Sequence, residues 1–193
     1  MKGRPVIHNS DQALVKAQEI FWKKGYTATS LGDLLSATGM GSGSFYNTYK
    51  SGKKELFKKS IDQRWEEYNA FEKLLGLSED PIKIIKEFFL SIADADQVSH
   101  LKGCFIVNTV IEMTGLDQDL QDQAMNMLKK VEQLYTDTIA DAQKNGKLKN
   151  QTDPVVLGRY LVTLWSGINV TRRLYPDKQI LLEQLELQLS VLK

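Results

Sequence analysis

The sequence contains little cysteine and no long apolar run. With one cysteine in 193 residues, no disulfide can form within the chain, which suits a reducing compartment. No apolar run reaches the roughly 18 residues of a membrane-spanning helix. The N-terminal residues lack the apolar core of a signal peptide. We therefore expect a cytoplasmic protein that makes no contact with a membrane.

Groups suited to acid–base or metal chemistry are also scarce. The two histidines are His8, in an N-terminal arm, and His100, in a predicted loop, and no H-E-x-x-H or C-x-x-C spacing occurs. Cys104 and Glu112 lie about two turns apart on one predicted helix face, but a cysteine with one carboxylate lacks a suitable base. We therefore expect no enzyme activity, no cofactor and no metal site. A small enzyme remains the least favoured alternative.

The net charge of +1 conceals an uneven distribution. Residues 1–55 hold eight Lys or Arg and four Asp or Glu, a net charge of +4. Residues 56–193 hold 17 and 20, a net charge of −3. A basic first quarter on an acidic remainder indicates that one end of the molecule meets a polyanion.

Hydrophobic residues recur at helical spacing along the chain, and no convincing strand is present. The helix at 53–75 would span about 35 Å and should connect a small head to a larger body. We expect an all-α protein with a head over residues 1–52 and a body over residues 53–193. The predicted helices cover residues 10–24, 31–38, 42–49, 53–75, 81–92, 103–113, 117–145, 153–174 and 176–192.

Two short helical patterns within residues 27–54 are joined by a glycine-containing turn, the sequence form of a helix-turn-helix. Ser30 and Asp33 have the spacing of a capping box, and Gly39 fits a left-handed helix end. In the second helix Phe45 and Tyr49 share a face and should pack inward. Ser42 is a plausible cap for this helix. Small or hydrogen-bonding side chains, together with one lysine, then face outward, as expected for a helix that enters a groove: Ser42, Ser44, Tyr46, Asn47, Thr48 and Lys50.

The pattern F-W-K-K-G-Y-T-A-T-S-L-G-D-L, followed by G-S-F-Y-N-T-Y-K-S-G-K-K-E-L-F, resembles the tetracycline-repressor-like (TetR) family of transcriptional regulators. The G-C-F-I-V-N-T segment at residues 103–109 is similar to one branch of that family. The resemblance implies an all-α homodimer whose three N-terminal helices bind duplex DNA and whose body holds a ligand pocket and the dimer interface. It implies a repressor that a small-molecule effector releases from its operator. A helical protein-interaction module without DNA binding remains an alternative.

The resemblance also implies roles for particular residues. Lys53 and Lys54 stay open as phosphate contacts, because the segment between Tyr49 and Leu56 is one residue longer than the common form. The last two helices should form the dimer interface, with Trp165 as a candidate anchor. The implied DNA contacts are Arg4, Ser30, Ser42, Gly43, Ser44, Tyr46, Asn47, Thr48 and Lys50.

Several body residues are candidates for a ligand pocket, although any of the aromatic and sulfur-containing ones can equally be plain core. Cys104 has two interpretations. It is either a reactive sensor of electrophiles or oxidants, or a small buried hydrophobe, which is the commoner role of a lone cysteine. The candidates are Phe88, Cys104, Phe105, Asn108, Met113, Met125, Tyr160 and Trp165.

Overall fold

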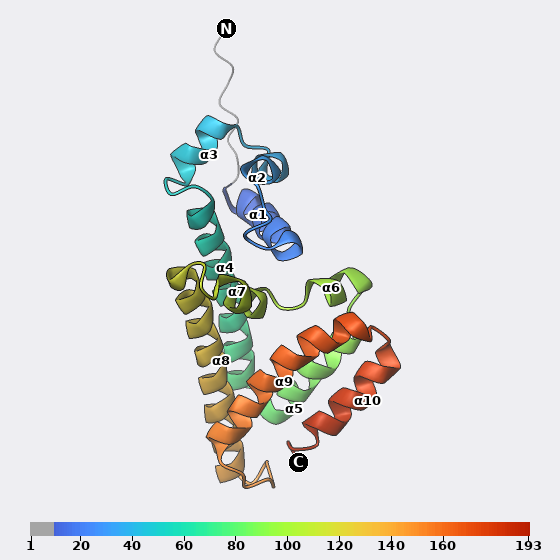
Figure 1. The fold of residues 1–193 in the computed structure, drawn as a ribbon. Coiled ribbons are helices and arrows are strands. Elements are labelled where there is room, and N and C mark those ends of the chain that lie inside the picture. The colour runs from blue at the N-terminus through green and yellow to red at the C-terminus, as the bar shows by residue number, and fades with distance from the viewer. Residues whose placement is uncertain (1–9) are drawn as a thin grey trace.

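A computed structural model describes residues 10–193, which form helices and connecting turns with no strand among them (Figure 1). All nine predicted helices are present. The elements are α1 (Ser10–Lys24), α2 (Leu31–Thr38), α3 (Ser42–Thr48), α4 (Lys53–Leu77), α5 (Pro81–Leu90), the 3-10 helix η1 (Ser91–Asp94), α6 (Gln97–Lys102), α7 (Phe105–Met113), α8 (Gln118–Lys144), α9 (Pro154–Leu174) and α10 (Lys178–Leu189).

The short helix α6 was not predicted, and the expectation that His100 lies in a loop is wrong. The Asp96 side chain accepts a hydrogen bond from the Ser99 backbone N–H and caps this helix, which ends at Gly103. His100 is buried within it. Six residues are too few for a hydrophobic period to be visible in the sequence.

The small head formed by α1, α2 and α3 shares its core with part of the body. Phe21 and Phe45 of the head belong to the same buried cluster as Phe105 and Met113 of α7 and Leu120 of α8. The head core is therefore continuous with α7 through α1 and the start of α4, where the Phe57 ring contacts both Phe21 and Phe105.

Helix α4 belongs to both parts of the molecule. Its 25 residues span about 37 Å and run from beneath α3 into the body alongside α8, which confirms its predicted connecting role (Figure 1). Its first turns bury Leu56, Phe57 and Ile61 in the head cluster, whereas Leu75 near its end belongs to the body cluster. The predicted boundary at residue 52 therefore coincides with the start of a shared helix.

The rest of the body packs around a second cluster. Helices α5, α8, α9 and α10 supply most of its buried side chains, among them Phe89, Tyr135, Leu161 and Leu185. None of the helices in residues 10–193 is long and apolar enough to cross a membrane.

A candidate DNA-binding head and two candidate effector cavities

Glycine residues shape the turn between α2 and α3. Gly39 adopts the left-handed conformation, with φ +71°, and its N–H donates to the carbonyl of Leu35, as predicted for the end of α2. The expectation that Ser42 caps α3 is wrong. Gly41 is the N-cap residue, no side chain bonds there, and Ser42 is the first helical residue.

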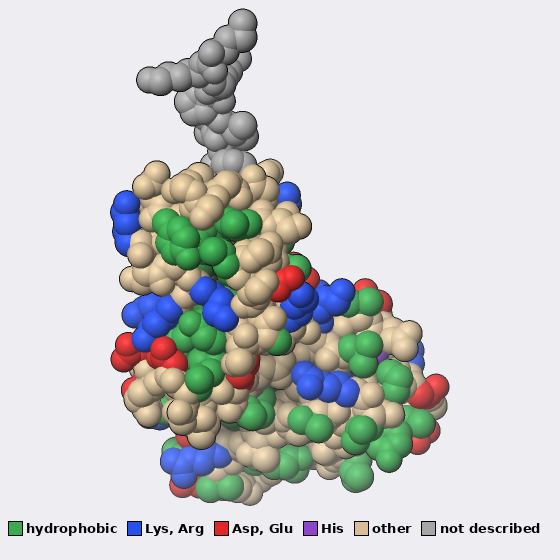
Figure 2. Space-filling view, turned by 45° about the horizontal axis from the view of Figure 1, so that its top comes forward, with side chains coloured by type: hydrophobic (Ala, Val, Ile, Leu, Met, Phe, Trp, Pro, Cys, Tyr) green, Lys and Arg blue, Asp and Glu red, His purple; other side chains and the backbone are tan. Residues whose placement is uncertain are grey.

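The two faces of α3 are as the sequence predicts. Phe45 is 0% exposed and Tyr49 is buried, whereas the Tyr46 side chain is 48% exposed. The head surface in Figure 2 is mostly uncharged, with basic side chains at its flanks. The outward residues are Ser42, Gly43, Ser44, Tyr46, Asn47, Thr48 and Lys50.

The capping box at the start of α2 is confirmed. The Asp33 backbone N–H donates to the Ser30 hydroxyl oxygen at 3.1 Å, and the Ser30 N–H and hydroxyl both donate to the Asp33 carboxylate. Lys24 forms an ion pair with Asp33 at 2.6 Å. Hydrogen bonds from Lys24 and from Ser30 lower the pKa of Asp33 to about 2. Ser30 is exposed, but its hydroxyl already serves the cap.

The three other basic residues considered as DNA contacts have different positions. Arg4 lies outside the described residues. Lys53 donates to the backbone carbonyls of Tyr26 and Thr29. Lys54 forms ion pairs with carboxylates at the start of α8, at 2.8 and 3.1 Å. Lys53 therefore links α4 to the loop between α1 and α2, and Lys54 links α4 to the start of α8.

A cavity of about 150 Å³, which we call the body cavity, lies between α4, α5, α7, α8 and α9. Three of the predicted ligand residues line it, namely Phe88, Cys104 and Trp165, and the rings of Phe88 and Trp165 stack with centroids 5.2 Å apart. The remaining lining residues are Arg64, Glu67, Tyr68, Phe71, Ile106, Met127, Leu128, Val131, Leu134 and Tyr135.

Two tyrosines, Tyr68 and Tyr135, line the body cavity. Burial and a hydrogen bond to Glu72 raise the pKa of Tyr68 to about 12. Burial also raises the pKa of Tyr135, whose hydroxyl forms no hydrogen bond with the described residues. Tyr135 is therefore a neutral donor in an otherwise largely apolar wall.

Three predicted ligand residues line neither the body cavity nor the second cavity described below. Met113 is fully buried in the core shared by head and body. Tyr160 packs against the body core, and its hydroxyl donates to the Gln188 carbonyl at 2.8 Å. Met125 is half-buried on α8. Helical spacing could not separate these residues from the cavity-lining ones.

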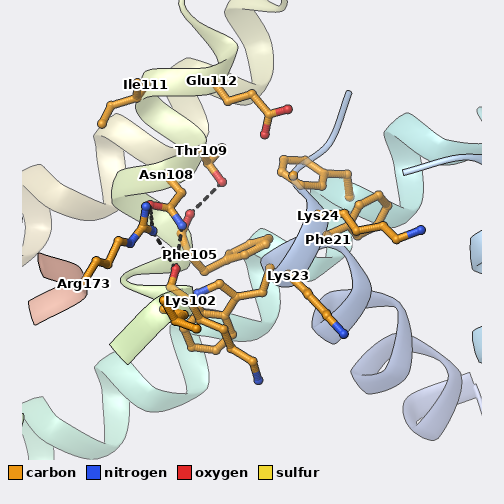
Figure 3. A pocket seen from close by; sticks show the side chains of 14 residues that line it. Phe21, Lys23, Lys24, Lys102, Phe105, Asn108, Thr109, Ile111, Glu112 and Arg173 are labelled. Carbon is orange, nitrogen blue, oxygen red and sulfur yellow. Dashed lines mark hydrogen bonds between the residues drawn. The ribbon is translucent and has the colours of Figure 1, made fainter. Parts of the chain in front are cut away.

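Phe105 and Asn108 line a different hollow, of about 350 Å³, which we call the interdomain cavity (Figure 3). It lies between α1 and α4 on one side and α6, α7 and α9 on the other. Its lining residues are Phe21, Trp22, Lys23, Lys24, Gly25, Phe57, Leu101, Lys102, Phe105, Asn108, Thr109, Ile111, Glu112 and Arg173.

Glu112 connects the body to the head across this cavity, a role that the sequence did not suggest. Its two carboxylate oxygens accept hydrogen bonds from the backbone N–H groups of Tyr26 and Thr27, each at 2.8 Å. Gly25 permits the approach, because it has φ +83° and a Cβ there would lie 3.0 Å from the carboxylate oxygens. Cys104 faces the other cavity, so the structure does not pair it with Glu112.

Comparison with known proteins agrees with this architecture. A family model described as bacterial regulatory proteins, tetR family, matches residues 13–59, and one described as Tetracyclin repressor-like, C-terminal domain, matches residues 82–185. The chain is 31% identical over 190 residues to the uncharacterized HTH-type transcriptional regulator YezE of Bacillus subtilis, across 94% of this chain and 96% of that protein. It is 26% identical over 175 residues to the HTH-type transcriptional repressor ComR of Escherichia coli, across 89% and 83%.

A solved structure of the TetR family regulator CifR, a cysteine mutant complexed with 26-base-pair operator DNA, has the same fold. Its TM-score is 0.84 at 21% identity, over 99% of this chain and 100% of that one. The family models span the helix-turn-helix and most of the body, and the fold agrees throughout. The chain therefore belongs to the TetR family of DNA-binding transcriptional regulators.

Proposed function

We propose that this protein is a cytoplasmic repressor that binds operator DNA as a homodimer and is released by a small molecule bound in its body. The polar outward face of α3 carries the proposal, because it lies over a buried Phe45 and Tyr49 and is free to enter a major groove. The name of ComR and the operator complex of CifR support the assignment.

We assign the operator contacts to α3 and its flanks. Tyr46 and Asn47 are long enough to reach base edges, whereas Thr48 and Lys50 at the end of the helix suit phosphates. The Thr48 hydroxyl donates to the Ser44 carbonyl at 3.0 Å, which leaves its oxygen able to accept. Arg4 on the preceding arm would add a minor-groove contact.

We assign the dimer interface to α9 and α10. Large apolar side chains are exposed on both helices and on the segment between them, including Leu174, Tyr175, Ile180 and Leu187. Exposed apolar groups of this size mark contact surfaces. Trp165 does not contribute as an anchor in this proposal, since it stacks on Phe88 inside the body.

The body cavity suits a small, mainly apolar effector. Its wall consists largely of aliphatic and aromatic side chains, with the Tyr135 hydroxyl as a neutral donor. Its volume of about 150 Å³ is below the usual range for ligand sites, so a molecule of few heavy atoms fits best. A binding role is favoured over catalysis, since Glu112 is occupied by backbone donors in a separate place from Cys104.

A gel shift on duplexes selected from a random pool tests the proposal. Wild-type protein should retard a selected duplex, and its affinity should fall steeply with rising salt because phosphate contacts release counterions. Lys50→Ala should weaken binding, whereas Lys144→Ala, which removes an exposed lysine at the far end of α8, should not. Selection of no duplex, or an equal loss in the two variants, would contradict the proposal.

A further inference from the structure

We propose that the interdomain cavity is a second effector site, which binds a small organic anion with a planar apolar part. The site is distinct from the body cavity, because the two share no lining residue. Its volume of about 350 Å³ lies within the range usual for small-molecule sites.

Aromatic rings supply the apolar wall of the site. Phe21 and Trp22 come from the head, Phe57 from α4 and Phe105 from α7. The Phe57 and Phe105 rings have centroids 5.5 Å apart, and those of Trp22 and Phe105 are 6.0 Å apart. A flat hydrophobic group would bury its surface against these rings.

The charge of the lining favours an anion. Among the described residues that line the cavity, Lys23, Lys24, Lys102 and Arg173 are basic and Glu112 is the one carboxylate. Both Glu112 oxygens are occupied by backbone N–H donors. Lys24 and Lys102 are paired with Asp33 and Glu19, whereas Lys23 and Arg173 form no ion pair with the described residues, so two free cations face the one carboxylate of Glu112.

Hydrogen bonds hold the Arg173 guanidinium at this site and leave some of its N–H groups unused. Its Nη2 donates to the Lys102 carbonyl at 2.9 Å and to the Asn108 side-chain oxygen at 3.1 Å, and Figure 3 shows the two side chains pointing toward each other. Its Nε and Nη1 donate to no group in residues 10–193. Gly103 makes room for it, because a Cβ there would lie 2.6 Å from Nη2. A fixed guanidinium with free N–H groups suits a carboxylate or sulfonate.

A ligand here would touch both sides of the head–body contact. Glu112 binds the backbone of Tyr26 and Thr27 at one edge, and the Trp22 indole N–H donates to the Gly103 carbonyl at 3.2 Å at the other. A bound anion would favour one head orientation over others and so change operator affinity. This regulatory consequence rests on the proposed function, whereas the binding itself does not.

Calorimetric titration with 2-naphthoate, using its neutral analogue 2-naphthamide as the control ligand, tests the binding. Naphthoate should bind saturably, and about tenfold more tightly than the amide, because only the carboxylate pairs with Arg173. Arg173→Gln should remove this preference. Arg159→Gln, an exposed arginine on the same helix whose partner is Glu132, should leave it unchanged.

Ile111 offers a direct test of the charge requirement. It lines the cavity and is 66% exposed, so either charge is tolerated there without loss of the fold, which a thermal melt would verify. Ile111→Glu should weaken naphthoate binding about fivefold and Ile111→Lys should strengthen it. Val131→Phe, which fills the body cavity, should have no effect on naphthoate.

Three results would overturn the proposal: no saturable binding, equal affinity for acid and amide, or loss of binding in Val131→Phe alone. A gel shift with naphthoate present then measures the regulatory consequence. Failure of the protein to bind DNA would refute the proposed function and leave the calorimetric result intact, so the two failures are distinguishable.

Discussion

Asp33 links head stability to pH through the cap of α2. Its pKa is lowered to about 2 in the folded head, below the ordinary 3.8. The charged form is therefore favoured by folding, and its contribution is complete above about pH 4 and is lost as pH falls toward 2. We expect Asp33→Asn to lower the thermal midpoint at pH 6, and the difference from wild type to shrink as the pH falls from 4 to 2. Asp141→Asn, at an exposed position on α8, serves as the control.

Phe45 and Tyr46 are adjacent residues with opposite roles. Phe45 is fully buried in the head core, so Phe45→Ala should destabilise the protein by about 3–5 kcal/mol. Tyr46→Ala should retain the melting temperature within a few degrees but weaken operator binding, because the ring is exposed. Thermal melts beside gel shifts measure both. An early melt for Tyr46→Ala with a normal one for Phe45→Ala would mean that α3 is oriented the other way round.

Cys104 is the N-cap residue of α7, half-buried at the wall of the body cavity. The sensor hypothesis predicts that N-ethylmaleimide releases wild-type protein from DNA and leaves the Cys104→Ser complex intact, since adduct formation would fill the cavity. Equal release from both proteins, or a thiol that reacts only after unfolding, would support a packing role instead.

Helices α9 and α10 should hold the dimer together. Leu187 is 74% exposed on α10, so Leu187→Asp should leave the monomer folded and weaken the dimer by introducing an unpaired charge into the interface. Leu77→Asp is a matched control, because Leu77 is 76% exposed at the end of α4. Sedimentation velocity would show the difference. A Leu187→Asp protein as dimeric as wild type would place the interface elsewhere.

Across the whole molecule, the contact of Glu112 with the head should control how freely the head moves. Glu112→Ala removes the acceptor of two backbone N–H groups, each part of a charge-assisted hydrogen bond. We expect faster hydrogen exchange at the amides of Tyr26 and Thr27, with a stability loss of about 1–3 kcal/mol. Glu132→Ala, which removes the partner of Arg159 in the body, should leave exchange in the head unchanged. Unchanged exchange in Glu112→Ala would argue against the connection.

Nine of the ten α-helices in residues 10–193 and the outward face of α3 could be predicted from the sequence, because both depend on neighbours three or four residues apart. The Ser30–Asp33 box, the left-handed Gly39 and the pairing of Phe45 with Tyr49 are all local. The family could likewise be predicted, since its motif lies within one continuous stretch. Helix α6 was missed because it is too short to show a period.

Contacts between side chains that are distant in the sequence could not be predicted in this way. Helical spacing marks Cys104 and Met113 alike as inward, yet one lines a cavity and the other fills a core. Glu112 accepts hydrogen bonds from residues 85 and 86 positions away, and no local sequence pattern predicts such partners. Capping and periodicity follow from the geometry of one helix, whereas cavities and long-range contacts follow from how several helices pack.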